Sequence, residues 1–102
     1  MSAGIIHSLL LRSENDILTC KNNIFEITIK FVDVSDRIED VKRMINLHEN
    51  NMYKNTKIIE KLRKLFIYLS RERDNARHEI LNLKDKLKKL KQKVKEETQL
   101  LE

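Results

Sequence analysis

Apolar residues recur along this chain in one unbroken heptad that runs from Ala3 to Leu101. With every seventh residue from Ala3 taken as position a, 24 of the 29 a and d positions are apolar, although only 40% of all residues are. A repeat of 3.5 residues keeps one stripe of an α-helix facing a neighbouring helix over many turns. The pattern therefore predicts an all-α protein made of long coiled-coil helix. The predicted oligomer seam consists of Leu10, Ile17, Ile24, Ile27, Phe31, Val34, Ile38, Val41, Ile45, Ile59, Leu62, Phe66, Leu69, Ile80, Leu83, Leu87, Leu90 and Val94.

Four segments follow from this pattern: a flexible start at 1–4, a helical segment at 5–45, an Asn-rich segment at 46–56 and a second coiled coil at 57–102. The Asn-rich segment holds four Asn in eleven residues, and Asn is a poor residue for helix interiors. It is either a turn, which would make a helical hairpin, or a polar layer or hinge in one continuous helix. The flanking halves share one heptad phase, which has a chance of about one in seven if they are independent. The prediction is a mainly continuous helix, with the hairpin as the alternative.

A second apolar stripe accompanies the seam in the first half of the chain. It lies at the b and f positions, which a two-stranded coiled coil leaves to solvent. The seam of this half also has β-branched residues at both a and d, a pattern that in parallel coils favours more than two strands. We therefore expect a further partner helix on this flank, so that residues 5–45 form a bundle. The second-partner stripe is Leu11, Leu18, Phe25, Ile29 and Val32. A β-strand is a competing interpretation of Ile24–Val34, which is rich in β-branched residues.

Polar residues at seam positions are expected to set register and partner choice. His48 and Asn55 occupy d positions, and Arg73 is the only charged residue at an a position. Arg73 opposite itself in a homodimer would bury like charges, whereas opposite an acid it would select a partner. This favours a hetero-oligomer with other coiled-coil proteins, with a homo-oligomer as the alternative.

Charge is concentrated near the end of the chain. The net charge is +5, and seven Lys with one acid, Asp85, lie between Lys84 and Lys95. Lys is a good helix former, so a solvated coiled-coil surface is the first interpretation. An acidic protein surface is a possible partner, and nucleic acid or an anionic membrane is less favoured because the run has no Arg and no aromatic residue. The basic surface is Lys84, Lys86, Lys88, Lys89, Lys91, Lys93 and Lys95.

The sequence offers no catalytic, cofactor-binding or metal-binding motif. His7, His48 and His78 are too widely spaced to share a metal on one helix, and a glycine-rich phosphate loop is absent from a chain with one Gly. Cys20 is single, and neither a signal peptide nor a transmembrane span is recognisable. We therefore expect a non-enzymatic coiled-coil scaffold subunit without cofactors, cytoskeletal or similar, located in the cytoplasm or nucleus. Binding of nucleic acid, chromosomes or membranes through Lys84–Lys95 is the alternative function.

Overall fold

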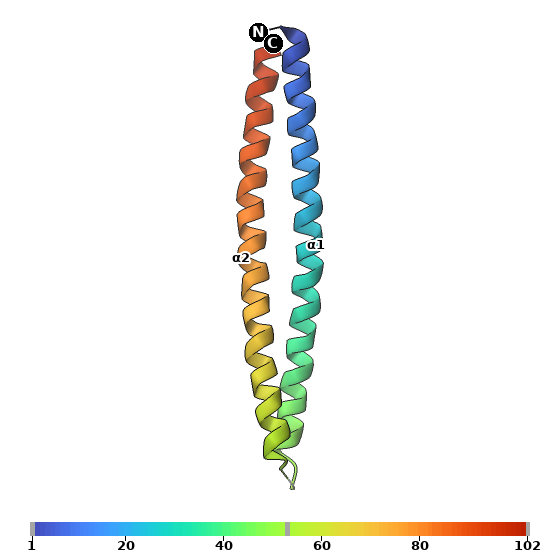
Figure 1. Ribbon diagram of the computed structural model, residues 1–102, viewed down its shortest axis with the longest axis vertical. Coiled ribbons are helices and arrows are strands. Elements are labelled where there is room, and N and C mark those ends of the chain that lie inside the picture. Colours follow the sequence, from blue (N-terminus) through green and yellow to red (C-terminus); the bar gives the residue numbers. More distant parts are fainter. Residues whose placement is uncertain (1, 53, 102) are drawn as a thin grey trace. The chain divides into compact units, whose positions relative to one another are not determined.

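The computed structural model describes residues 2–52 and 54–101, which form two long α-helices. α1 spans Ala3–Glu49 and α2 spans Thr56–Leu101 (Figure 1). The described residues contain no strand, so Ile24–Val34 is helical and the all-α prediction is confirmed. The favoured continuous helix is not found, because α1 ends at Glu49 and a new helix begins at Thr56. The hairpin alternative, with its turn in the Asn-rich segment, is the architecture of this chain.

The start of each helix is fixed by a polar cap. The backbone nitrogen of Ile58 donates to Oδ1 of Asn55 at 3.2 Å, and the backbone nitrogen of Ile5 donates to Oγ of Ser2 at 3.4 Å. In both cases a side chain just outside the helix accepts from its third residue, which would otherwise lack a backbone acceptor. Asn55 therefore begins α2 as its N-cap instead of interrupting a longer helix.

The common heptad phase of the two halves does not require a continuous helix. In a hairpin each helix turns its seam toward the other, and the connection between them can have any length that lets the chain reverse. The two helices then share a heptad phase by coincidence, which has a chance of about one in seven.

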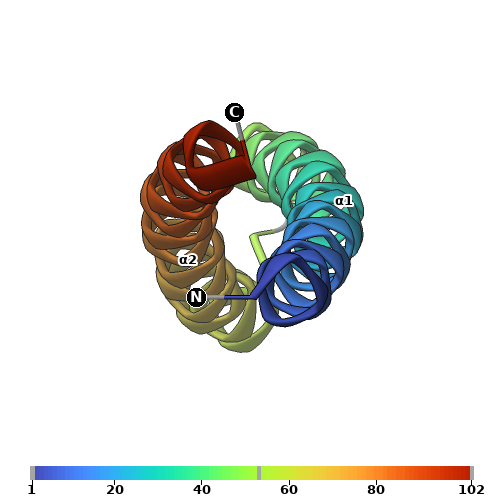
Figure 2. The same ribbon diagram turned by 90° about the horizontal axis from the view of Figure 1, so that it is seen from above.

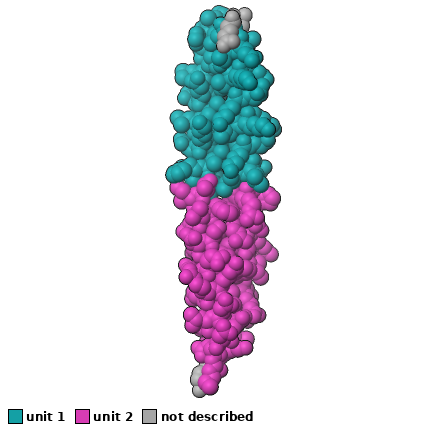
Figure 3. Space-filling model, turned by 180° about the vertical axis from the view of Figure 1, so that it is seen from behind, with its two compact units in different colours: residues 1–27, 79–102 teal, residues 28–78 magenta. Residues whose placement is uncertain are grey.

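The chain divides into two compact units, which Figure 3 shows in different colours. Unit 1 contains residues 1–27 and 79–102, and unit 2 contains residues 28–78. Both units contain parts of α1 and α2, because the two ends of the chain belong to unit 1 and the turn belongs to unit 2. Each unit is therefore an antiparallel pair of helical segments.

Unit 2 is a hairpin with an apolar core. Ile38 is fully buried, and Val34, Val41, Leu62 and Leu69 surround it in one cluster. Ile45 and Phe66 pack against this cluster while partly exposed. Arg63 and Glu49 form an ion pair between the two helices beside the turn, and Lys30 and Glu72 form another with the charged atoms 3.7 Å apart. All these contacts join residues on opposite sides of the turn, as a hairpin requires.

Unit 1 pairs the first half of α1 with the last part of α2. Figure 2 shows these two segments from above, with the start of α1 in blue and the end of α2 in red. Ile6, Ser13, Cys20 and Glu97 are buried there. The Cys20 sulfur lies 3.2 Å from the backbone oxygen of Leu83 on α2. The seam of unit 1 is therefore mostly apolar, with Ser13 and Glu97 as buried polar exceptions.

Candidate interaction surface

The predicted oligomer seam is occupied within a single chain. All of its residues are buried or half-buried, and in each unit they lie between α1 and α2. Nine apolar residues among those that the structure describes are buried within this one chain. The hairpin supplies the second helix that the seam requires.

A buried polar pair crosses the seam of unit 1. The Ser13 hydroxyl lies 3.1 Å from Oε2 and 3.2 Å from Oε1 of Glu97, and donates to this carboxylate. Nζ of Lys93 lies 4.0 Å from the same carboxylate. Because a buried carboxylate is costly without hydrogen bonds, this pairing favours one register of α1 against α2.

The heptad pattern alone gives this pair no role. Ser13 and Glu97 are polar exceptions at d positions that lie at opposite ends of the chain. The sequence does place them on opposite sides of the Asn-rich segment, Ser13 33 residues before its start and Glu97 41 residues after its end. This placement brings the two residues together only if the chain reverses direction in the Asn-rich segment.

The three residues predicted to set register or partner choice lie in different environments. Asn55 caps α2, and His48 is half-buried near the end of α1. Arg73 is half-buried on the α2 side of unit 2, and its Nε is buried without a hydrogen-bond partner. Arg73 therefore faces the seam of its own chain, and the argument that it would meet a second Arg73 in a homodimer no longer applies.

The second-partner stripe is exposed along α1. In unit 1, Leu11, Leu18 and Phe25 are 61%, 58% and 66% exposed. In unit 2, Ile29 and Val32 are also more than half exposed. Exposed apolar side chains in a row, as opposed to scattered ones, are typical of interaction surfaces. These residues are not needed for the contact between α1 and α2.

Unit 2 carries further exposed apolar side chains on α2. Ile67 and Tyr68 are more than half exposed, and Ile58 and Leu65 are exposed to a smaller extent. They are interspersed with the charged residues of this helix segment, among them Lys61 and Lys64. This makes them a less continuous surface than the stripe on α1.

All seven lysines of the basic surface are exposed. Lys89 pairs with Asp85 at 3.1 Å within α2, and Lys93 approaches Glu97. The Lys89–Asp85 pair, which is exposed and lies within one helix, is weak at a solvated surface. The basic surface therefore keeps most of its charge for a partner or for solvent.

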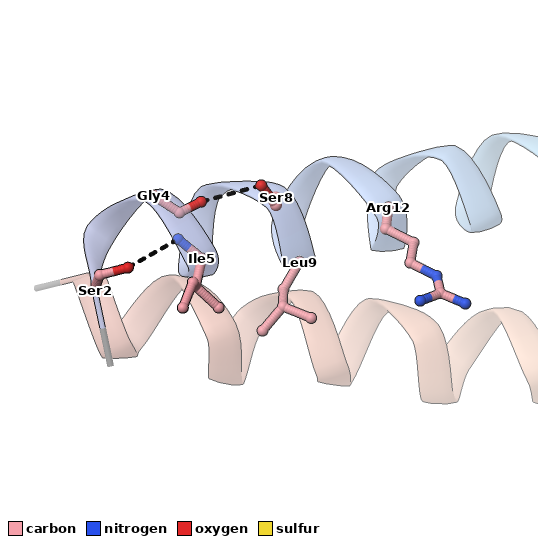
Figure 4. A pocket seen from close by; sticks show the side chains of 6 residues that line it. All are labelled: Ser2, Gly4, Ile5, Ser8, Leu9 and Arg12. Atoms are coloured by element: carbon pink, nitrogen blue, oxygen red, sulfur yellow. Dashed lines mark hydrogen bonds between the residues drawn. The ribbon is translucent and has the colours of Figure 1, made fainter.

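A shallow depression lies at the start of α1 (Figure 4). Ser2, Gly4, Ile5, Ser8, Leu9 and Arg12 line it, from the first turns of the helix. The Ser8 hydroxyl donates to the backbone oxygen of Gly4, so it is engaged with its own helix. Among the described residues of this lining, Arg12 is the only ionisable side chain.

Two further searches concern metal sites and membrane spans, and a third concerns similarity to known proteins. Within residues 2–52 and 54–101 there is no group of three His, Cys, Asp or Glu side chains placed to hold a metal ion. Neither helix contains, over its described residues, an apolar stretch sufficient to cross a membrane. The chain matches no family model, no curated protein and no solved structure with which we compared it.

Proposed function

We propose that this protein is a non-enzymatic helical hairpin that mediates protein–protein assembly through the exposed apolar stripe of α1. The observation that carries the proposal is the exposure of Leu11, Leu18 and Phe25 on a helix whose seam is already occupied. The seam explains how the chain folds. The stripe has no role in that contact, so an additional helix is the simplest explanation for it.

Covering the stripe would supply part of the free energy that assembly requires. Burying a Leu or Phe side chain contributes about 1.5–3 kcal/mol, so covering these three, each more than half exposed, would contribute roughly 4 kcal/mol. A partner that also covered the flanking parts of α1 would add to this. An interface of this kind supports a scaffold or structural subunit, in the cytoskeleton or elsewhere.

An intracellular location belongs to the same proposal. The one cysteine, Cys20, is a free and buried thiol. A chain that uses a packed helical seam and no disulfide for stability suits a reducing compartment.

The proposal is tested by the size of the assembly in native extracts of cells that produce the protein. We expect the wild-type chain to migrate well above the 12.2 kDa of a single copy. The triple substitution Leu11→Glu, Leu18→Glu and Phe25→Glu should reduce it to single-chain size while the purified variant stays helical. Migration of the wild-type chain as a single copy, or of the triple variant with the wild-type assembly, would contradict the proposed function.

A second candidate function is electrostatic binding of a polyanion through the basic surface. The exposure of all seven lysines favours it. The run has no Arg for bidentate phosphate contacts and no aromatic residue for base stacking, so such binding would be non-specific.

A further inference from the structure

The outer face of α1 in unit 1 has a heptad pattern of its own. Its residues are Ser8, Leu11, Asn15, Leu18, Asn22 and Phe25, which are separated alternately by three and four residues and are all exposed. This is the spacing of a and d positions in a coiled-coil seam. The d-like positions hold Leu11, Leu18 and Phe25, and the a-like positions hold Ser8, Asn15 and Asn22.

The pattern is distinctive because the chain is 36% charged, yet none of these six outer positions is. The corresponding outer positions of α2 in the same unit include Asp85, Lys88 and Lys95. An ordinary solvated helix face resembles the one on α2. The face on α1 instead combines large apolar residues at d-like positions with Asn at two a-like positions. In coiled coils an Asn at an a position specifies register and strand number, at a cost in stability.

We propose that this face of α1 binds the same face of a second copy of the chain, with the two α1 helices parallel. The proposal rests on the assembly function described above and names its partner. In a parallel pair each a-like residue lies opposite itself, so the amides of Asn15 in the two copies meet, as do those of Asn22. An amide carries both donors and an acceptor, so it is complementary to a second copy of itself.

Charges beside the face are complementary in the same arrangement. Lys21 and Glu26 flank the face on its two sides and are five residues apart, and both are exposed. In a parallel two-stranded coil this spacing places Lys21 of one copy opposite Glu26 of the other, and two-fold symmetry forms the pair twice. The preceding pair in this pattern, Glu14 and Thr19, contains no like charges.

The proposal is tested by the molar mass of the purified chain in light scattering, with two variants matched in position and exposure. Leu18 on α1 is 58% exposed and Leu81 on α2 is 57% exposed, and both occupy b positions in unit 1. We expect twice 12.2 kDa for the wild type and for Leu81→Glu, and 12.2 kDa for Leu18→Glu with unchanged helical circular dichroism. A wild type that is monomeric at micromolar concentration, or a dimer that Leu18→Glu leaves intact, would overturn the proposal.

Strand direction is tested by disulfide formation in a Cys20→Ala background. Asn15→Cys should be oxidised rapidly to a dimer linked between identical residues, because a parallel seam places the two thiols opposite each other. Gln92→Cys, at an outer position of α2, should stay reduced under the same conditions. Failure of Asn15→Cys to cross-link in a chain that is dimeric by light scattering would overturn the parallel arrangement.

The two proposals fail in distinguishable ways. If the purified chain is a monomer but migrates in native extracts as a larger assembly that the triple stripe variant abolishes, the stripe binds a different protein and the second copy is the wrong partner. If the chain migrates as a single copy in extracts as well, the assembly function itself is wrong.

Discussion

The hydroxyl of Ser13 lies 3.1 Å from a carboxylate oxygen of Glu97, although 84 residues separate the two in the sequence. Both side chains are more than nine-tenths buried in unit 1. Neither residue has an apparent use in a single straight helix, where each would be a defect in the apolar seam. In an antiparallel pair each satisfies the other, so the contact links the position of the turn to the register of the two helices.

Removing one member of this pair should destabilise the hairpin. Ser13→Ala leaves the Glu97 carboxylate without its hydroxyl donor, and we expect a loss of about 1–2 kcal/mol in the free energy of unfolding. Chemical denaturation followed by circular dichroism measures it. The double variant Ser13→Leu with Glu97→Leu should recover this loss, since replacing both partners by apolar residues removes the desolvation cost. A double variant less stable than Ser13→Ala would show that the pair contributes more than mutual satisfaction.

Substitution of Asn55 distinguishes a hairpin from a continuous helix by the sign of its effect. As the N-cap of α2, Asn55→Ala should lower stability by about 1 kcal/mol, whereas Asn55→Asp should be close to neutral. In a continuous helix the same Ala would raise stability, because Ala is the better residue in a helix interior. Thermal unfolding of the three chains decides between the two, and a higher melting temperature for Asn55→Ala would contradict the capped turn.

Truncation of Ile38 should be the most damaging single change in unit 2. Its side chain is fully buried within the cluster of Val34, Val41, Leu62 and Leu69. Ile38→Ala removes apolar contacts and leaves a cavity, so we expect a loss of about 2–5 kcal/mol. Ile67→Ala is the control, because Ile67 is 51% exposed in the same unit and should change stability by about 0.5 kcal/mol or less. If both substitutions lowered the free energy of unfolding equally, Ile38 would not be part of the core of unit 2.

The basic surface should behave as an ordinary polycation. Replacing five of its lysines (84, 86, 88, 91 and 95) by Gln should abolish weak binding to duplex DNA or anionic vesicles and leave the molar mass of the chain unchanged. For the wild type this binding should fall steeply between about 50 and 200 mM salt, because it depends on counterion release. Fluorescence anisotropy across this salt range is the measurement. Tight wild-type binding at the higher salt, lost in the Gln variant, would favour the nucleic-acid or membrane function over assembly alone.

The heptad pattern predicts the helices and separates the buried positions of each helix from the exposed ones. Ile38 and Leu69 are buried and Leu11 and Phe25 are exposed, as their positions in the repeat indicate. The repeat could not reveal which helix the seam faces, because a helix of the same chain and a helix of another chain satisfy it equally well. The Asn-rich segment determines which of the two applies, but Asn55 at a d position fits a polar layer in a continuous helix as well as the N-cap that it forms.

Partner selectivity was harder to predict for the same reason. Arg73 indicated a partner of different sequence only as long as its seam was assumed to lie between chains. Once the seam lies within the chain, selectivity depends on the outer face of α1, where Asn15 and Asn22 alternate with Leu residues. In the heptad that starts at Ala3, both Asn residues occupy position f, which points away from the seam, so that heptad assigns them no role.

The most direct test of this account is a distance measured within one chain between Asn23 and Lys86. Both are exposed residues of unit 1, one on α1 and the other on α2. Each is replaced by Cys and spin-labelled in a Cys20→Ala background, and the labelled chain is diluted with an excess of unlabelled chain so that only distances within a molecule are recorded. The hairpin predicts a separation of about 20 Å, since packed helices lie about 10 Å apart and the labels add their own length. A separation near 95 Å, which is the length of 63 residues of continuous helix, would contradict it.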